Sequence, residues 1–306
     1  MPKISVIVPV YNTEKYLPAT LKFIAEQTFS DMEIIFVNDC STDNSLALLQ
    51  EYASNDKRVK ILNNEKNSGA AISRNKGIEA AQGEYLLFLD ADDLFEPTLV
   101  ADVVARIELS GADIVIFNYD RTNSSKKINL KKCRKVTSKL YFSPDEIPKR
   151  IFNIGPPNAF SKCFKRSLIE NNNIRFQNLK SCNDVYFTII ALALAEKISI
   201  LDKVLIHYRT DAQNNITSKR GSYYENIIKA MEEVKNALVK AGKYEKYKKS
   251  FIRAFKNSIR YEYKFISKEN IPLFIDYCKE KLGQDWSIYK TVTYPTLIQK
   301  ILRLFE

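Results

Sequence analysis

Residues 3–118 alternate between two kinds of segment, and this alternation restricts the fold more than any other feature of the chain. Short apolar runs rich in β-branched residues are each followed by a longer segment with apolar residues three and four positions apart. Such alternation is typical of parallel βαβ units, so we predict an α/β fold with a mostly parallel, Rossmann-like sheet flanked by helices. The strands are predicted at 4–10, 33–38, 59–63, 85–89 and 113–118, and the helices at 14–27, 43–54, 70–81 and 97–110.

The pattern changes after residue 118. Residues 119–143 are polar and basic, which predicts an insertion or a mobile loop over one edge of the sheet. Mixed patterning then resumes, with a helix predicted at 183–196 and a short hairpin formed by 198–201 and 204–208. From residue 222 onward the pattern is helical. The predicted organisation is one α/β domain over 1–218, with halves at about 1–118 and 144–218, and a C-terminal helical appendage over 222–306.

The composition excludes several kinds of site. The chain has 306 residues with five cysteines and one histidine, and no CxxC pair, so we expect neither a disulfide framework nor a zinc site. A net charge of +11 indicates an anionic partner such as a nucleotide, a nucleic acid or an acidic lipid surface. No apolar run approaches the roughly 20 residues needed to cross a bilayer, so we expect a cytoplasmic protein.

Three polar loops follow strands of the predicted sheet. They begin at Tyr11, Asp39 and Asp90, each close behind an apolar run. Because ligands of such sheets bind beyond the carboxyl ends of the strands, we expect these loops to form one site.

The third loop carries two carboxylates, Asp90 and Asp92, on the same side of a short turn. Mn²⁺ and Mg²⁺ prefer such oxygen ligands and take the remaining ones from water and phosphates. Two acidic residues after a strand, without further context, would more often cap the next helix. The strand context and the two neighbouring loops favour a metal site.

The second loop carries Asp39 at the end of its strand. This carboxylate is placed to accept hydrogen bonds from a nucleobase, since an ionised carboxylate can only accept. Asp43, four residues later, is explained fully as a cap of the next helix.

Four segments carry a specific family pattern. They are Ser5 to Asn12, Val37 to Asp43, Asn67 to Gly69 with Ser73 to Ile78, and Gly83 to Asp93. In order and spacing these segments resemble the GT-A fold inverting glycosyltransferases of family 2, the type found in bacterial cell-surface polysaccharide synthesis. The match is strong over 3–118, recognisable over 156–218 and nearly absent elsewhere. The resemblance implies a nucleotide-sugar donor, commonly UDP-linked.

The resemblance also implies roles for residues of the first half. Those around the donor's nucleoside would be Pro9, Tyr11, Asn12, Glu14 and Asp39. Asp92 would be the principal metal ligand and Asp90 a secondary one, with Asp90 and Ala91 at the ribose or the sugar. Arg74 would lie beside the donor and order the acidic loop, although a surface arginine is the alternative.

Two positions in the second loop depart from the family pattern. Asn38 stands where an acid is common, and Cys40 where glycine is common. Both leave Asp39 intact, so they question the backbone of this loop and the base preference.

In the second half, Asp184 holds the position of the family's catalytic base. Asn183 replaces the usual first acid of that segment, and the missing charge should lower the proton affinity of Asp184. A helix cap is the alternative role for Asp184. Lys162 and Arg209 are implied as cationic clamps on the donor phosphates.

His207 has two alternative roles. It either packs in a strand against Tyr208, or contacts the diphosphate or the metal.

These parts predict direct displacement at the anomeric carbon, with a base on the acceptor hydroxyl and a cation on the departing diphosphate. The acceptor is expected to be a glycan or a lipid-linked molecule. An inactive nucleotide-sugar-binding module is the alternative, and no nucleic-acid-binding motif is present.

The helices predicted after residue 222 have two alternative roles. Their aromatic residues either pack onto the rest of the chain, or they and the amphipathic stretch at 297–305 rest peripherally on an anionic inner membrane face.

Overall fold

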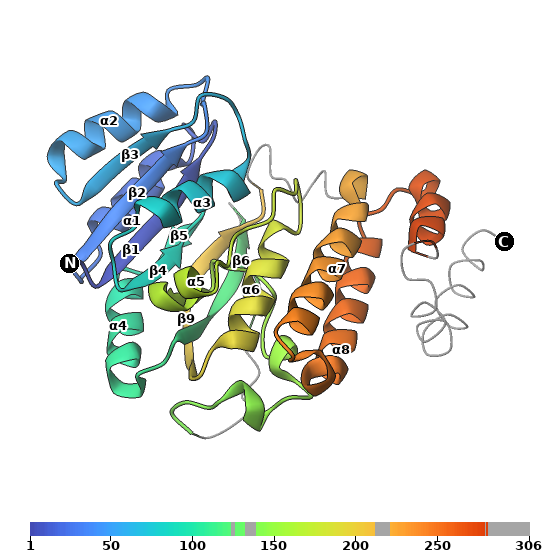
Figure 1. Ribbon diagram of the computed structural model, residues 1–306. Coiled ribbons are helices and arrows are strands. Elements are labelled where there is room, and N and C mark those ends of the chain that lie inside the picture. Colours follow the sequence, from blue (N-terminus) through green and yellow to red (C-terminus); the bar gives the residue numbers. More distant parts are fainter. Residues whose placement is uncertain (124–125, 132–138, 212–220, 279, 281–306) are drawn as a thin grey trace.

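The structure is a computed structural model that describes residues 1–123, 126–131, 139–211, 221–278 and 280. Its strands form one sheet in the order β3-β2-β1-β4-β8-β6-β9-β5, and β7 pairs with β6. Helices cover both faces of the sheet, and two long helices stand beside it (Figure 1). The predicted α/β class is confirmed.

The first half consists of parallel βαβ units, as predicted. β1 (Ile4–Val10) lies between β2 (Met32–Asn38) and β4 (Tyr85–Phe88), and β2 pairs with β3 (Val59–Asn63), all in parallel. The helices of this half are α1 (Leu17–Ala25), α2 (Ser45–Asn55), α3 (Ala70–Ala80) and α4 (Leu99–Ser110). The approach of α3 to β1 needs a glycine, because a Cβ at Gly77 would lie 2.4 Å from Ile7 Cγ2.

The second half mixes both strand directions. β8 (Lys162–Lys165) is antiparallel to both β4 and β6 (Ile114–Asn123). β9 (Ile198–Arg209) runs parallel to β6, and the short β5 (Leu94–Phe95) pairs antiparallel with β9. The acidic loop between β4 and β5 therefore lies beside the end of β9.

Two predictions for this half are wrong. The hairpin predicted at 198–208 is the single strand β9, because β6 pairs with residues on both sides of Asp202 and Lys203, where the register shifts. The loop predicted from residue 119 begins instead as a continuation of β6, which pairs with β7 (Lys126–Lys131). Residues 132–138 of the same predicted loop lie outside the described part.

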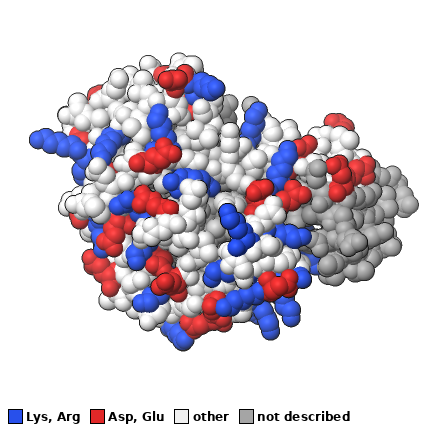
Figure 2. Space-filling view, viewed as in Figure 1, with Lys and Arg blue, Asp and Glu red and all other residues white. Residues whose placement is uncertain are grey.

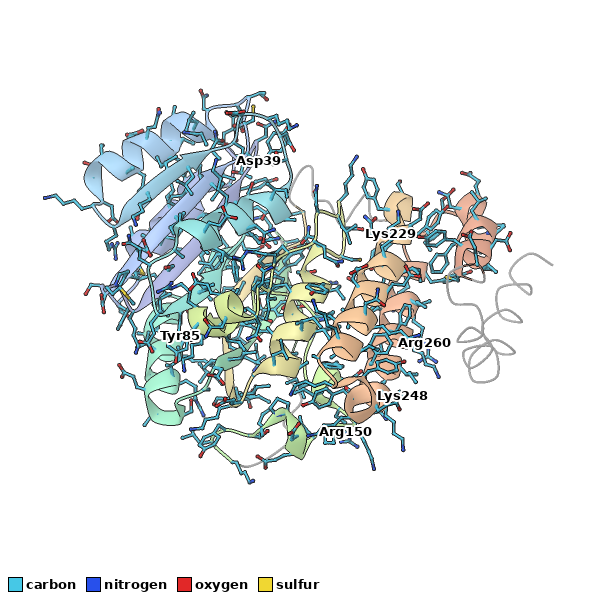
Figure 3. All side chains as sticks on the ribbon, in the orientation of Figure 1. Asp39, Tyr85, Arg150, Lys229, Lys248 and Arg260 are labelled. Carbon is cyan, nitrogen blue, oxygen red and sulfur yellow. The ribbon has the colours of Figure 1, made fainter. Side chains whose placement is uncertain are left out.

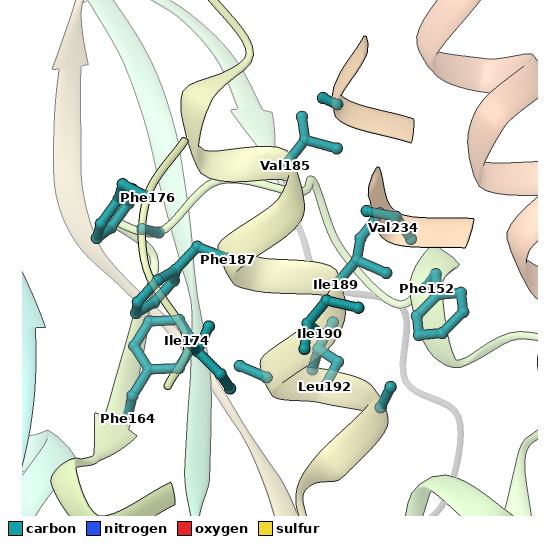
Figure 4. Close-up of a cluster of buried hydrophobic side chains, with 14 of the residues drawn as sticks. Phe152, Phe164, Ile174, Phe176, Val185, Phe187, Ile189, Ile190, Leu192 and Val234 are labelled. Atoms are coloured by element: carbon teal, nitrogen blue, oxygen red, sulfur yellow. The ribbon is translucent and has the colours of Figure 1, made fainter. Parts of the chain in front are cut away.

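An apolar cluster fills each side of the sheet. One cluster holds side chains of α1, α2 and α4, and the other those of α3, α5 (Arg166–Asn171) and α6 (Asn183–Leu194). The second is aromatic at its centre, where Phe176 and Phe187 stack with centroids 4.1 Å apart (Figure 4). Phe88 meets both rings edge-on. Phe88 lies two residues before Asp90 and Phe187 three after Asp184, so this packing fixes the two segments relative to each other.

The C-terminal helices share the second cluster. α7 (Glu225–Lys240) packs on α6, and α8 (Tyr244–Tyr263) packs on α7. Tyr247, Phe251 and Phe255 are buried there, which confirms for α8 that its aromatic residues pack onto the rest of the chain. The stretch at 297–305 lies outside the described residues, and the boundary near 218–222 stays a prediction. Among the described residues, no helix has both the length and the apolar character required to span a membrane. Short helices also lie at Pro144–Glu146, Ile151–Asn153 and Lys268–Asn270.

Candidate active site

The acidic loop follows β4 at the edge of the sheet. Asp92 is half-buried, and burial together with the charge of Asp90 raises the pKa of Asp92 to about 6. Asp93 is buried, and one of its carboxylate oxygens accepts a hydrogen bond from the Arg209 backbone N at 2.8 Å. The other oxygen has no hydrogen-bond partner among the residues that the structure describes. Burial and the charges of Asp92 and Asp90 raise the pKa of Asp93 well above its usual range. The loop is therefore a concentration of negative charge.

Arg74 joins this loop to the start of α6. Its Nη2 donates to Asp90 Oδ1 at 2.6 Å, its Nη1 donates to Asn183 Oδ1 at 3.4 Å, and its guanidinium lies over the Phe176 ring at 5.4 Å. The side chain is only 12% exposed, which removes the alternative of a surface arginine. The structure thus gives Arg74 the loop-ordering contact that the resemblance implied.

Arg209, at the end of β9, closes the loop from the other side. Its Nε donates to the Asp92 carbonyl oxygen at 2.9 Å, and its guanidinium lies 5.1 Å from the centre of the Tyr16 ring. The positive charge of Arg209 is thereby held next to the acidic loop, at the backbone of Asp92.

His207 has a role that neither sequence alternative described. Its Nδ1 lies 2.7 Å from Asp120 Oδ1 and its Nε2 lies 2.8 Å from Glu96 Oε1. Both ring nitrogens are engaged with carboxylates, so the structure does not support His207 as a metal ligand. The contact instead ties β6, β9 and the segment after β5 together beneath the acidic loop.

Asp39 organises a loop of its own. Its Oδ1 accepts from Asn64 Nδ2 at 2.7 Å and the Ser68 backbone N at 2.8 Å, and its Oδ2 accepts from the Gly69 backbone N at 2.7 Å. Sequence reasoning gave Asp39 only a nucleobase to bind, and this structural role is additional. Cys40 has φ of 60°, the left-handed conformation that explains why glycine is common there.

Hydrogen bonds connect the loop after β1 to the loop after β2. Asn12 Oδ1 accepts from the Thr42 backbone N at 2.8 Å, and Glu14 Oε2 accepts from the Asn44 backbone N at 2.9 Å. Asn44 occupies the N-cap position of α2, and Asp43, one residue earlier, accepts from the backbone N of Ser45, the first residue of the helix, at 2.9 Å. Two of the predicted nucleoside contacts, Asn12 and Glu14, therefore also shape the loop.

Pro9 and Tyr11 stand at the same end of β1. Pro9 is half-buried within the strand, and Tyr11 is 45% exposed just beyond it.

Lys162 differs from its predicted role. The side chain is 1% exposed, and its Nζ donates to the carbonyl oxygens of Pro156 at 2.8 Å and Asn158 at 2.7 Å. A buried ammonium held by loop carbonyls fixes the segment before β8. It is not placed as a clamp on a donor phosphate.

Asp184 lies in the first turn of α6. Cys182 occupies the N-cap position in a left-handed conformation, so Asp184 is not the cap that the alternative described. Burial raises the pKa of the Tyr119 phenol, and the Asp184 carboxylate adds to that rise, which places Asp184 near β6. Asn183, the residue before Asp184, accepts a hydrogen bond from Arg74, which also pairs with Asp90 of the acidic loop.

Contacts from α8 to this region were not foreseen. Tyr261 OH accepts from Arg121 Nη2 at 3.1 Å, and Glu262 Oε1 accepts from Cys182 Sγ at 3.4 Å. No local sequence signal links residues 80 or more positions apart, so only the fold could show them.

The residues of the acidic loop fit a divalent cation. They offer carboxylate oxygens, the ligands Mn²⁺ and Mg²⁺ prefer, and the raised pKa of Asp92 shows negative charge that a cation would offset. Within the described ranges, no group of three or more His, Cys, Asp or Glu residues could hold a metal. A cation here would therefore take further ligands from the donor phosphates and water.

The comparisons with known proteins agree with one another. The family model described as "Glycosyl transferase family 2" matches residues 5–171. EpsH of Bacillus subtilis (strain 168) is 32% identical over 257 residues, which make up 81% of this chain and 72% of EpsH. The poly(ribitol-phosphate) beta-N-acetylglucosaminyltransferase TarS of Staphylococcus aureus is 29% identical over 261 residues, which make up 84% of this chain and 44% of TarS.

A solved structure gives the same result for the fold. The crystal structure of S. aureus TarS 1–349 in complex with UDP-GlcNAc superimposes with a TM-score of 0.74 at 24% identity, covering 92% of this chain and 80% of that one. The GT-A fold implied by the sequence is thereby confirmed. With more than half of its length matched by the family model, the chain belongs to glycosyl transferase family 2.

Proposed function

We propose that this glycosyltransferase moves a sugar, with inversion, from a UDP-linked donor to a hydroxyl of a glycan or lipid-linked acceptor in surface polysaccharide synthesis. TarS is named an N-acetylglucosaminyltransferase and its structure holds UDP-GlcNAc, which makes that nucleotide-sugar the first donor to test. Asp184 is the proposed base and Asp92 the principal metal ligand, with Asp90 secondary.

One observation carries the proposal. The guanidinium of Arg74 contacts both Asp90 and Asn183, so the loop that would hold the donor and the helix turn that carries Asp184 share one partner. A transferase needs such proximity, because the base must reach the acceptor hydroxyl while the donor phosphates lie at the cation. A protein that only bound the donor would have no need to fix Asp184 there.

The donor would lie along the carboxyl ends of the strands. Pro9, Tyr11, Asn12, Glu14 and Asp39 would surround its nucleoside, and Ala91 would lie at the ribose or sugar. The loops that contain these residues are held by the hydrogen bonds between residues 12–14 and 42–44 and around Asp39. A preformed nucleoside site lowers the entropy lost on binding.

In the transfer step, Asp184 takes the proton from the acceptor hydroxyl as that oxygen attacks the anomeric carbon. Arg209 supplies positive charge next to the acidic loop, where the diphosphate would depart. Because attack and departure occur on opposite faces of the sugar, one base suffices and the configuration inverts. Mn²⁺ or Mg²⁺, when bound by Asp92 and Asp90, would supply further positive charge for the diphosphate.

A donor panel tests the proposal. Release of the nucleoside diphosphate is measured from UDP-GlcNAc, UDP-glucose, UDP-galactose and GDP-mannose, each with and without Mn²⁺. We expect metal-dependent release from at least one UDP-sugar, and faster release from UDP-sugars than from GDP-mannose. Donor binding without any release would favour the alternative of an inactive nucleotide-sugar-binding module.

A further inference from the structure

The outer face of α8 is a basic surface that the proposed site does not use. The inner face of this helix is apolar and buried against α7 and the segment around Phe152. Its buried residues recur every three or four positions, as Tyr247, Ser250, Phe251, Ala254 and Phe255. The residues between them are therefore turned away from the core.

Four of the outward residues are cations in a single row. Lys249, Arg253, Lys256 and Arg260 follow one another at intervals of four, three and four residues. At the rise of an α-helix the row is roughly 16 Å long. Figure 3 shows Arg260 on the side of α8 that faces away from α6. Figure 2 shows Lys and Arg side chains, with Asp and Glu among them, over the lower part of α7 and α8.

The row borders a groove with a volume of about 320 Å³. Its lining is Lys249, Ile252, Arg253, Lys256, Asn257 and Arg260. Within the ranges that the structure describes, Lys249, Arg253 and Arg260 make no ion pair. Burial and the neighbouring Arg260 guanidinium lower the pKa of the Lys256 ammonium. An anion in the groove would offset this accumulation of positive charge.

We propose that this groove binds an acidic polymer, a chain with repeated phosphodiester or carboxylate groups, which is the acceptor of the transfer reaction. The inference rests on the proposed function, because it concerns the acceptor of the same enzyme. A row of evenly spaced cations matches repeated charges along a chain better than a single small anion.

The groove leads toward the proposed base. At the C-terminal end of α8, one residue after Arg260, Tyr261 contacts Arg121 at the end of β6 at 3.1 Å. The next residue, Glu262, contacts Cys182, two positions before Asp184. A chain that lies along the row therefore approaches the acceptor side of the site with its charges on α8.

A membrane surface fits this face less well. Helices that lie on a membrane bury an apolar face in the headgroup region. The apolar face of α8 is already buried in the protein, and none of the exposed large apolar side chains of the described residues belongs to α8. What remains outward is a groove with charged walls and one half-buried isoleucine, Ile252.

The test measures binding of four probes to the full chain without donor, at physiological ionic strength. The probes are long-chain inorganic polyphosphate, polygalacturonate, neutral dextran and phosphatidylglycerol vesicles. We expect polyphosphate or polygalacturonate to bind, and which of them binds tells phosphodiester from carboxylate recognition. Lys249→Gln with Arg253→Gln should raise the Kd about tenfold, since two charge contacts are lost.

The matched control removes two exposed cations elsewhere. Lys22→Gln with Lys57→Gln lowers the net charge by the same amount and should change the Kd less than about twofold. Arg260→Gln, a second groove variant, should weaken binding about threefold. Thermal unfolding confirms that each variant folds.

Two results would overturn the inference. Equal weakening by both double variants would show that net charge and not the groove binds the polymer. Groove-dependent binding of vesicles, with neither polymer bound, would make α8 a membrane surface. Because donor turnover plays no part in these measurements, their failure and the failure of the proposed function can be told apart.

Discussion

Arg74 and Asp90 form an ion pair, with Nη2 and Oδ1 2.6 Å apart, and the same guanidinium reaches Asn183 at 3.4 Å. The acidic loop after β4 and the first turn of α6 come from segments almost a hundred residues apart. One planar side chain with donors on two nitrogens holds both. The spacing of the two proposed reacting groups therefore depends on a residue that need not touch the reacting atoms.

Replacing this arginine tests that dependence. Arg74→Lys keeps the positive charge but cannot hold two partners at once, so we expect kcat/KM for donor turnover to fall roughly 30-fold, the equivalent of about 2 kcal/mol. The control is Arg58→Lys. The guanidinium of Arg58 pairs with Asp56 at 2.7 Å, and this ion pair lies away from the site. Equal kcat/KM in wild type and Arg74→Lys would show that the bridge does not position the site.

Removing the proposed base should separate binding from transfer. Asp184→Asn preserves size and removes the proton acceptor, so transfer to acceptor should fall about 10³-fold while UDP affinity, measured by calorimetry, stays within about twofold. Asp31→Asn, at an exposed position before β2, serves as the control. Unchanged turnover in Asp184→Asn would remove this residue from the mechanism.

Metal removal addresses Asp92. Donor turnover should stop in EDTA and return with added Mn²⁺, and Asp92→Asn should raise the Mn²⁺ concentration for half-maximal turnover at least about tenfold. Asp102→Asn should leave that concentration unchanged, because it replaces a carboxylate on α4 that pairs with Lys203 of β9. Turnover that persists in EDTA would contradict a metal-dependent reaction.

A stability prediction concerns Glu33, a buried carboxylate beneath the first strands. It accepts from Ser5 Oγ at 2.6 Å, the Gln82 backbone N at 2.6 Å and Lys60 Nζ at 2.8 Å. Burial alone would raise its pKa, but these hydrogen bonds prevail and lower the pKa below the usual 4.5. We expect Glu33→Gln to lower the free energy of unfolding by about 2 kcal/mol at pH 7.

The pH dependence of that difference has a definite sign. A lowered folded pKa gives stability that is present above the ordinary value of 4.5 and is lost as pH falls through the folded value. The gap between wild type and Glu33→Gln, from urea unfolding, should therefore shrink below about pH 4.5. Glu84→Gln, which replaces an exposed carboxylate paired with Lys3, should show little effect at any pH. A gap that grows in acid would contradict the assignment.

Local patterns were enough to predict the first half of the fold. The β-branched runs and the helical spacing between them depend on neighbours in sequence, and the edge where polar loops gather follows from parallel pairing. The structure confirms β1 at 4–10 and β3 at 59–63 with unchanged bounds. It also gives Cys40 the left-handed backbone that the departure from glycine had put in question.

The errors arose where distant contacts decide. Asp202 and Lys203 were predicted to form the turn of a hairpin. Instead β6 pairs with residues on both sides of them, so that β9 continues as a single strand. The resemblance implied Lys162 as a clamp on the donor phosphates, but carbonyls of the preceding loop accept hydrogen bonds from its ammonium. His207 bonds two carboxylates from residues 87 and 111 positions away, which no local pattern reveals.

A crystal structure with Mn²⁺ and UDP-GlcNAc tests the central claim most directly. We predict that an Asp92 carboxylate oxygen contacts the metal and that Asp184 faces the anomeric carbon from the side opposite the diphosphate. A structure in which Asp92 lies remote from both metal and diphosphate, or Asp184 points away from the anomeric carbon, would contradict it.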